Sequence, residues 1–269
     1  MNKLHVHILI DRMIGLLSVG IVANIDDQEY IDIVKQVVLI RESCSMLGLT
    51  GCVETGTRLI QYAESGESRE FGGVKALADN LREDIRVALS RRIFLYIQDD
   101  RSEYVDNEKL FGATVFDAFP SAQRDIKEAG NCLAVECGTA CVFHLMRASE
   151  FSMRALARDR GVQFADKPLE EKEWGQILPN LDAKITALRM AANSNWPPGR
   201  KDEQLRFYSD AVQELRGFND AWRRHVSHAD SRAFYERDEA LGVYKHVRLF
   251  MQKLATKISE ASVTDEYWK

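Results

Sequence analysis

The chain has 269 residues, of which 45% are hydrophobic and 29% charged, a balance typical of a globular protein with material for two domains. Its formal net charge of -5 excludes a globally basic surface, so any nucleic acid must be held by a local patch. The 5 prolines and 16 glycines follow no repeating period, which excludes a collagen-like chain and a solenoid of short repeats.

The 5 cysteines, an odd number, favour a reducing compartment over a disulfide scaffold, and we expect a cytoplasmic protein. The apolar stretch from Leu4 to Ile25 lacks the basic leader of a signal peptide and is interrupted by polar side chains. We therefore expect neither a secretory leader nor a membrane span, but one or two buried or dimer-facing elements. The interrupting residues are His5, His7, Asp11, Arg12 and Asn24.

Two helices are expected in the first part of the chain. The segment Asp26–Gly48 begins with acidic residues that suit a helix N-terminus and ends in glycine. The segment Val74–Ser90 carries apolar residues at steps of three or four along one face. After it, the apolar run Ile93–Ile97 and the following Glu103–Val105 predict a small β-hairpin or an extended crossing.

A domain boundary is predicted at Phe119-Pro120-Ser121, where proline ends one element and serine N-caps the next. Five helices follow, separated by turns rich in glycine and proline, and they predict an antiparallel bundle. We thus expect an all-α protein, with a mostly helical domain of unassigned role over residues 1–119 and a helical bundle over residues 120–269. The five expected helices are Ser121–Glu136, Thr139–Arg160, Glu170–Ala192, Asp202–His228 and Asp238–Glu260.

Apolar stripes on three of the expected helices predict which faces are buried. Along each helix the apolar residues recur at steps of three and four, which places them on one side of the helix. The predicted core residues are Val74, Leu77, Leu81, Ile85 and Ala88 on the early helix, Leu205, Tyr208, Val212, Leu215, Phe218, Trp222 and Val226 on the penultimate helix, and Leu241, Tyr244, Val247, Met251, Leu254 and Ile258 on the last helix.

The hexapeptide Arg223–His228, at the end of the penultimate helix, collects the groups that cut RNA without a metal. That reaction needs a base for the ribose 2′-hydroxyl, an acid for the leaving oxygen and positive charge beside the phosphate. Imidazole, with an ordinary pKa of about 6.5, supplies the first two functions, and guanidinium supplies the third. The competing interpretation is a solvated helix end whose cations favour the negative pole of the helix dipole.

The spacing within the hexapeptide predicts how its side chains are directed. Arg224 and His228 lie one turn apart, roughly opposite the apolar stripe, and both are expected to be accessible. Arg223 and His228 are rotated by roughly 140° on an ideal helix, so they reach one substrate only if the helix bends or ends nearby. His225 and Ser227 are candidates for contacting the substrate, and the alternative for His225 is a hydrogen bond to a neighbouring carboxylate.

The chain has Arg223, four intervening residues and His228 near the end of the penultimate long helix of a bundle. This pattern resembles the motif of the HEPN ribonucleases, in which an arginine is followed by four to six residues and then a histidine. The segment Ala140–Glu150 is also similar to the second helix of HEPN domains, and the resemblance covers Ser121–Glu260. It implies a small all-α domain that pairs with a second copy, so that two motifs line one cleft. Many members cut RNA in phage-defence or toxin systems, and others have lost activity.

The resemblance implies that His228 transfers the proton or orients the 2′-hydroxyl, and that Arg223 binds the phosphate. The chain departs from the family at Arg224, where HEPN nucleases often have a polar residue such as asparagine. The extra charge either strengthens phosphate binding or indicates a different role.

Three charged residues of the second bundle helix, Arg147, Glu150 and Arg154, are spaced to share one helical face. Arg147 and Glu150 are candidates for supporting a cleft around His228. The alternative is a surface ion-pair ladder, or a buried pair that orients the bundle.

Cys137, Cys141 and His144 also share a helical face, which raises the question of a metal site. Structural zinc sites usually draw one cysteine pair from a loop and a second pair from elsewhere, so small buried thiols are the simpler expectation. The sequence contains no glycine-rich phosphate loop, no Gly-x-Ser-x-Gly elbow and no His-Glu-x-x-His helix. We expect no metal and no cofactor.

The leading hypothesis is a homodimeric, metal-independent endoribonuclease that cleaves single-stranded or loop RNA, with an antitoxin or a phage-derived trigger as a further partner. The alternative is a catalytically inactive helical module that binds nucleic acid or a protein through the same Arg and His cluster. A third hypothesis is a structural subunit whose N-terminal half recognises an activating signal.

Overall fold

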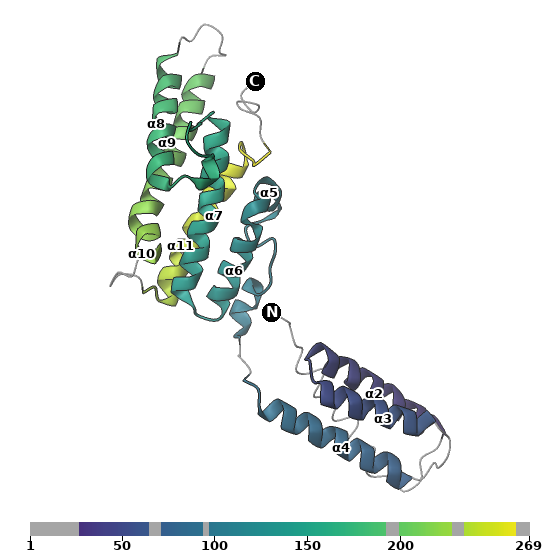
Figure 1. Cartoon of the computed structure of the whole chain (residues 1–269). Helices are drawn as coiled ribbons and strands as arrows, with labels where there is room; N and C mark the ends of the chain where they lie inside the picture. The colour runs from purple at the N-terminus through teal and green to yellow at the C-terminus, as the bar shows by residue number, and fades with distance from the viewer. Residues whose placement is uncertain (1–26, 65–70, 94–96, 192–198, 228–233, 262–269) are drawn as a thin grey trace. The chain divides into compact units, whose positions relative to one another are not determined.

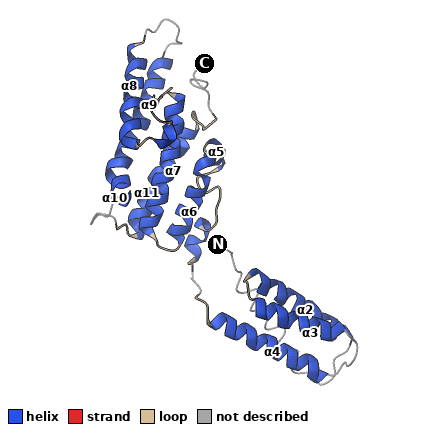
Figure 2. Ribbon diagram, viewed as in Figure 1, coloured by secondary structure: helices blue, strands red, loops and turns tan. Residues whose placement is uncertain are grey.

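The computed structural model describes residues 27–64, 71–93, 97–191, 199–227 and 234–261. All regular structure in these ranges is helical and none of it is strand, so the predicted all-α fold is confirmed (Figure 2). Within the same ranges, no helix is both long and apolar enough to cross a membrane. The chain divides into two compact units, one up to Leu95 and one from Tyr96 (Figure 1). The elements expected within Leu4–Ile25 lie outside the described residues.

The described part of the N-terminal unit holds three helices, namely α2 (Asp27–Met46), α3 (Thr50–Glu64) and α4 (Phe71–Ser90). As predicted, α2 ends at a glycine, because Gly48 adopts a φ of 64° that favours this residue. Backbone hydrogen bonds of 3.0 and 2.8 Å from the N–H groups of Gly48 and Leu49 close the last turn of the helix. This turn leads directly into α3, which the sequence pattern did not predict.

Apolar side chains of all three helices form the core of this unit. The stripe expected on α4 faces inward: Val74, Leu81 and Ile85 are buried, and Leu77 and Ala88 are partly buried against them. The remaining core residues of the unit are Ile33, Val37, Ile40, Cys44, Leu49, Cys52, Leu59, Ile60 and Ala78.

The chain after α4 differs from the predicted hairpin. Asp99–Tyr104 forms a 3-10 helix, η2, and residues 94–96 lie outside the described part of the chain. The ring of Tyr104 packs edge-on against the ring of Tyr244, with centroids 5.6 Å apart. The prediction of a strand at Glu103–Val105 is therefore wrong, because the aromatic side chain packs against a helix instead of lying in a sheet.

The C-terminal unit begins before the boundary predicted at Phe119-Pro120-Ser121. Phe111 and Val115 are buried in its core, and the short helix α5 (Ala113–Ala118) also lies within it. The proline opens a 3-10 turn, η3 (Pro120–Ala122), which leads into the next helix. It therefore marks an element boundary inside the unit, whereas the division between units lies earlier in the chain.

The bundle is built around α7, the longest described helix with 22 residues, which contacts α6, α8, α9, α10 and α11 (Figure 1). The helices expected after residue 120 are all present, and their ends differ from the prediction by a few residues. The main helices are α6 (Gln123–Ala134), α7 (Gly138–Asp159), α8 (Trp174–Met190), α9 (Arg200–Phe218), α10 (Arg224–Ser227) and α11 (Arg237–Ala255), with a 3-10 turn, η4 (Leu169–Glu171), before α8.

The apolar stripes predicted on the last two long helices contribute to the core of this unit. Most of their members are buried, and the others are partly buried and pack against them. The buried members are Tyr208, Val212, Leu215, Phe218, Tyr244, Val247, Met251, Leu254 and Ile258, and the partly buried members are Leu205, Trp222, Val226 and Leu241.

Tyr244 predicts a pH dependence of stability. Its ring packs edge-on against Tyr104 and Phe111, and burial raises the pKa of its hydroxyl from 10.0 to about 12, although Arg248 acts to lower it. The folded state therefore holds this proton more tightly, so the stabilising contribution is complete below the unfolded pKa and is lost as the pH rises through the folded pKa.

Between these two pKa values, we expect the free energy of unfolding of the wild type to fall by up to about 3 kcal/mol more than that of Tyr244→Phe. Urea titrations of both proteins at several alkaline pH values measure this difference. The same pH dependence in both proteins would show that Tyr244 does not contribute.

The start of α7 packs directly on another backbone segment. A Cβ atom at Gly138 would overlap the carbonyl oxygen of Tyr235 and lie 3.1 Å from that of Glu236. We expect Gly138→Ala to lower the free energy of unfolding by about 1–3 kcal/mol, because the two backbones must move apart. Gly242 on α11 is the matched control: nothing lies within 4 Å of a Cβ there, so alanine should raise stability by about 0.5–1 kcal/mol. Urea unfolding curves that show equal effects at the two glycines would contradict this explanation.

Candidate functional site

The helix α9 continues directly into a π-helical turn, η5 (Asn219–Arg223), and then into α10. Such turns are rare in proteins and are frequent at functional sites. The wider turn suits the apolar stripe, because Phe218, Trp222 and Val226 follow one another at steps of four and all contact the core. The sequence predicted a continuous α-helix here, and the structure differs from it at this turn.

An aromatic cluster holds the π-helical turn in place. The rings of Phe218 and Trp222 stack with centroids 5.3 Å apart, and the ring of His246 on α11 lies edge-on to them at 5.2 and 5.5 Å. On another side, the hydroxyl of Tyr235 donates to the carbonyl oxygen of Ala221 at 3.4 Å. These contacts join the π-helical turn to α11 and to the segment before it.

The two arginines of the hexapeptide differ in their surroundings. The side chain of Arg224 is 64% exposed and lies 3.5 Å from the carboxylate of Asp220. Arg223 is half-buried at the end of the π-helical turn, and no residue that the structure describes forms an ion pair with it. The accessibility predicted for Arg224 is confirmed, and Arg223 keeps its donors for another acceptor.

The remaining hexapeptide residues as far as Ser227 lie within the described part of the chain. His225 is half-buried and Ser227 is exposed at the end of α10. His228 lies outside the described residues, so its approach to Arg223 stays a prediction.

The helix α7 lies beside both η5 and α10, as required if its side chains support the same site. The charged α7 residues that were expected to support this site form hydrogen bonds with other residues of the bundle. Arg147 Nε donates to Asp125 Oδ1 on α6 at 2.9 Å, and Glu150 accepts a hydrogen bond from Trp174 Nε1 at 2.9 Å. Glu150 also pairs with Arg154, so the ion-pair interpretation of these two is confirmed. A role for Arg147 and Glu150 beside the hexapeptide stays a prediction.

The residues considered for a metal site lie in different surroundings. Cys141 is buried, and burial together with Cys132 raises the pKa of its thiol to about 12. Cys137 is exposed at the start of α7, contrary to the expectation of a buried thiol, and His144 contacts Asp125. Across the described ranges, no three His, Cys, Asp or Glu side chains are grouped to hold a metal ion.

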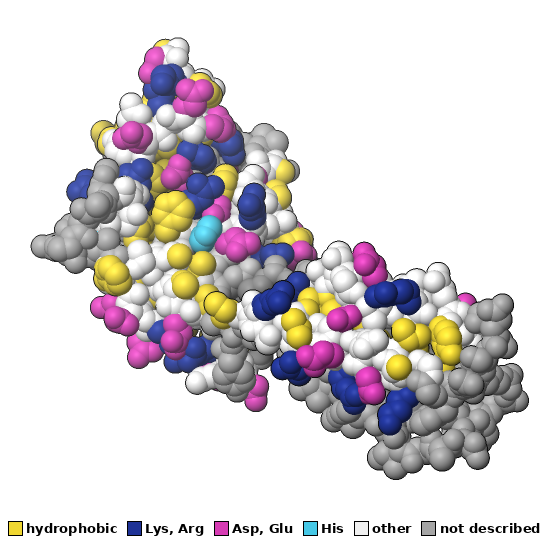
Figure 3. Space-filling model, turned by 60° about the horizontal axis from the view of Figure 1, so that its bottom comes forward, with side chains coloured by type: hydrophobic (Ala, Val, Ile, Leu, Met, Phe, Trp, Pro, Cys, Tyr) yellow, Lys and Arg dark blue, Asp and Glu magenta, His cyan; other side chains and the backbone are white. Residues whose placement is uncertain are grey.

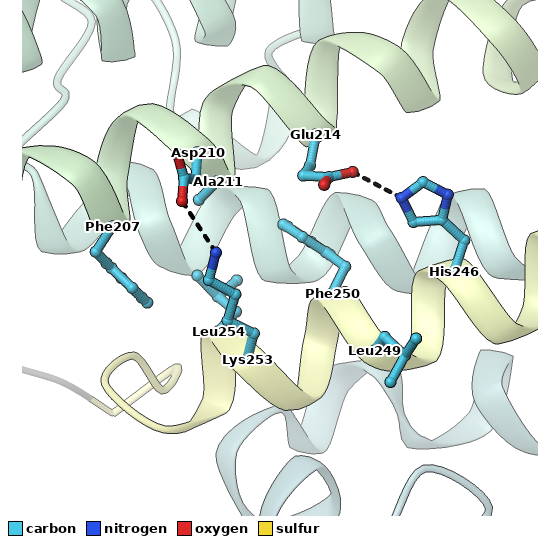
Figure 4. Close-up of a pocket in the computed structure, with 9 residues that line it drawn as sticks. All are labelled: Phe207, Asp210, Ala211, Glu214, His246, Leu249, Phe250, Lys253 and Leu254. Atoms are coloured by element: carbon cyan, nitrogen blue, oxygen red, sulfur yellow. Dashed lines mark hydrogen bonds and ion pairs between the residues drawn. The ribbon is translucent and has the colours of Figure 1, made fainter.

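A groove between α9 and α11, which the sequence did not predict, extends to the π-helical turn. Figure 4 shows two polar contacts across it: His246 Nε2 lies within hydrogen-bond distance of Glu214, at 2.7 Å, and Lys253 Nζ forms an ion pair with Asp210 at 3.1 Å. This part of the groove has a volume of about 220 Å³, and a neighbouring part extends it to Trp222. An apolar floor between charged walls suits an amphipathic partner segment. The floor residues are Phe207, Ala211, Leu249, Phe250 and Leu254.

Charges of both signs alternate over the faces of the two units shown in Figure 3, with hydrophobic side chains between them. This agrees with the net charge of -5. A nucleic acid bound there would contact a few cations in a local patch instead of a broad basic field.

No family model, no curated protein and no solved structure matches this chain. The resemblance to HEPN ribonucleases therefore rests on the motif spacing and on the segment Ala140–Glu150 alone.

Proposed function

We propose that this chain is a metal-independent endoribonuclease of the HEPN type, which cleaves single-stranded or loop RNA. The observation that carries the proposal is the position of Arg223, which is half-buried at the end of a π-helical turn and not ion-paired with any described residue. A guanidinium held in this way keeps its planar fork of donors for a phosphate. His228 follows within five residues and supplies an imidazole near that phosphate.

The proposed reaction starts when His228, as neutral imidazole, accepts the proton of a ribose 2′-hydroxyl. The 2′-oxygen attacks the adjacent phosphorus, the bond to the 5′-oxygen breaks, and that oxygen takes a proton from an imidazolium. The products are a 2′,3′-cyclic phosphate and a free 5′-hydroxyl. Arg223 and Arg224 stabilise the charge that develops on the phosphate oxygens, and His225 and Ser227 contact the substrate.

A second copy of the chain completes the acid–base set in this proposal. One copy supplies a single catalytic imidazole, whereas the reaction uses both a base and an acid. A two-fold pair presents two motifs that face each other. The proposed setting is phage defence or a toxin–antitoxin system, with an antitoxin or a phage-derived trigger as a further partner. A strict monomer in sedimentation that cleaves RNA would remove the argument for a dimer.

The test incubates the purified full chain with single-stranded RNA in excess EDTA. We expect cleavage, with 2′,3′-cyclic phosphate and 5′-hydroxyl ends identified by mass spectrometry. A matched 2′-deoxy strand should remain intact, because it lacks the attacking hydroxyl. Products that carry 5′-phosphate ends, or cleavage of the 2′-deoxy strand, would contradict the mechanism.

The groove between α9 and α11 favours a second candidate, a catalytically inactive helical module that binds a protein or a nucleic acid. Its apolar floor is suited to the apolar face of a partner helix. RNA that binds with salt-dependent affinity but yields no product would support this candidate over the nuclease.

A further inference from the structure

A buried carboxylate on α6 holds two side chains of α7, away from the hexapeptide in the sequence. Asp125 Oδ1 lies 2.8 Å from His144 Nδ1 and 2.9 Å from Arg147 Nε. The side chain of Asp125 is only 8% exposed. His144 and Arg147 lie three residues apart and therefore on one face of α7, so a single oxygen orients two neighbouring donors.

The carboxylate of Asp125 is ionised in the folded protein. Burial acts to raise its pKa, but hydrogen bonds from His144 and Arg147 outweigh burial and hold the pKa below the usual value. An ionised carboxylate only accepts hydrogen bonds, so the proton between the two groups belongs to His144 Nδ1. The other ring nitrogen, Nε2, is on the opposite side of the imidazole and faces away from Asp125. Arg147 likewise uses Nε here, and its two terminal nitrogens have no hydrogen-bond partner among the residues that the structure describes.

The outer side of this cluster reaches solvent. The side chain of Arg147 is 53% exposed and that of His144 is 27% exposed, in contrast to the buried Asp125. Phe143 beside them is 41% exposed. Its ring centroid lies 5.9 Å from the guanidinium of Arg147 and 5.7 Å from the ring of His144. An aromatic ring, a cation and an imidazole therefore share one small surface on a rigid helix.

Stability alone does not account for this arrangement. Ion pairs that reach solvent contribute about 0–1 kcal/mol, and a buried carboxylate carries a desolvation cost that an apolar side chain would avoid. An exposed phenylalanine also leaves apolar area in water. By contrast, a carboxylate behind an imidazole is the arrangement that sets the tautomer and direction of a functional histidine.

We propose that Phe143, His144 and Arg147 bind a nucleoside phosphate. The phosphate accepts hydrogen bonds from the terminal nitrogens of Arg147 and from Nε2 of His144 in its imidazolium form, and the base stacks on Phe143. Asp125 is a positioning residue, because it holds both donors without touching the ligand. The site uses no residue of the hexapeptide and goes beyond the proposed ribonuclease activity. Arg147, which the sequence suggested as a support of the cleft around His228, here contacts the ligand itself.

The test measures binding to the full chain by isothermal titration calorimetry, with AMP, a short 2′-O-methylated RNA oligonucleotide and inorganic phosphate as probes. The 2′-O-methyl groups remove the nucleophile, so binding is separated from cleavage. Arg147→Ala should weaken binding of AMP and the oligonucleotide by at least about 10-fold, since a hydrogen bond to a charged group is lost. Similar affinities for AMP and the oligonucleotide would assign the site to a free nucleotide, and a clear preference for the oligonucleotide would assign it to a strand.

Phe143→Leu separates base stacking from phosphate binding. We expect this substitution to weaken the binding of AMP and of the oligonucleotide by about 5-fold or more and to leave the binding of inorganic phosphate unchanged. The variant alters an exposed ring, so it keeps the inference testable if Arg147→Ala does not fold. Equal affinity of Phe143→Leu and the wild type for AMP and the oligonucleotide would refute the nucleoside assignment.

Arg158→Ala is the matched control, because Arg158 is an exposed arginine on the same helix, paired with Glu170. It should bind all probes as the wild type does. Asp125→Asn should weaken binding, because it removes the carboxylate that orients both donors. In the wild type, the ¹⁵N chemical shifts of the His144 ring should change when AMP is added, which a merely structural role would not produce. The site is refuted if the wild type binds neither nucleoside phosphate, or if Arg158→Ala weakens binding as much as Arg147→Ala does.

Discussion

Replacing His228 by alanine is expected to slow RNA cleavage by about 10²–10⁴-fold, because acid–base catalysis by one side chain typically contributes this much. RNA binding should change far less, since Arg223 and Arg224 supply the charge that holds the phosphate. Single-turnover cleavage and fluorescence anisotropy measure the two quantities separately. The far-UV circular dichroism spectrum should match that of the wild type, and imidazole added to the assay should restore part of the rate.

Arg223→Ala provides the second arm of this experiment. It should weaken both RNA binding and cleavage, because the phosphate loses charge-assisted hydrogen bonds. Arg216→Ala is the matched control, since Arg216 is an exposed arginine earlier on α9 that pairs with Asp182. Full cleavage by His228→Ala, or equal losses from Arg216→Ala and Arg223→Ala, would remove the hexapeptide from the mechanism.

The other large effect, on the stability of the C-terminal unit, is expected from replacing Trp174, which lies at the first position of α8 in the core of the bundle. Its side chain is fully buried, and its indole N–H donates to Glu150 Oε2 at 2.9 Å. Trp174→Ala would leave a large cavity and remove a partner of Glu150. We expect the free energy of unfolding to fall by about 3–5 kcal/mol. Trp174→Phe, which keeps a ring in the site, should cost less.

Urea unfolding followed by tryptophan fluorescence measures this loss in the C-terminal unit alone. All four tryptophans lie after Leu95, so their signal does not report on the N-terminal unit. A loss below about 1 kcal/mol for Trp174→Ala, which is the size of an average substitution, would show that this residue is not a core anchor. The tryptophans are Trp174, Trp196, Trp222 and Trp268.

Local sequence patterns predicted most of the helices, because apolar periodicity and terminal glycines act within a few residues. The helix α3 was missed. Gly51 and Gly56 weaken its intrinsic helix propensity, and its formation depends on contacts with α2 and α4. Packing between helices, which no local pattern encodes, therefore decided this element.

Two features of the C-terminal unit also depended on distant contacts. The 3-10 turn η2 occupies part of the predicted hairpin, and the aromatic ring of Tyr104 packs on Tyr244, far along the chain. Phe111 is buried in the bundle, so the boundary expected near Pro120 is only a break between elements. A proline signals where an element ends, but burial determines which unit that element joins.

For the candidate site, the sequence by itself determined which chemical groups are present and which lie on the solvent side of the helix. The helical wheel is enough to predict that Arg224 is accessible, because the opposite face of the helix is apolar. The π-helical turn before it and the groove beside it were decided only by the tertiary structure, since both depend on how α9 packs against α11. The same is true of Asp125, which meets His144 and Arg147 across 19 and 22 residues of chain. Contacts of that kind form only when two helices dock, because nothing in the local sequence joins their side chains.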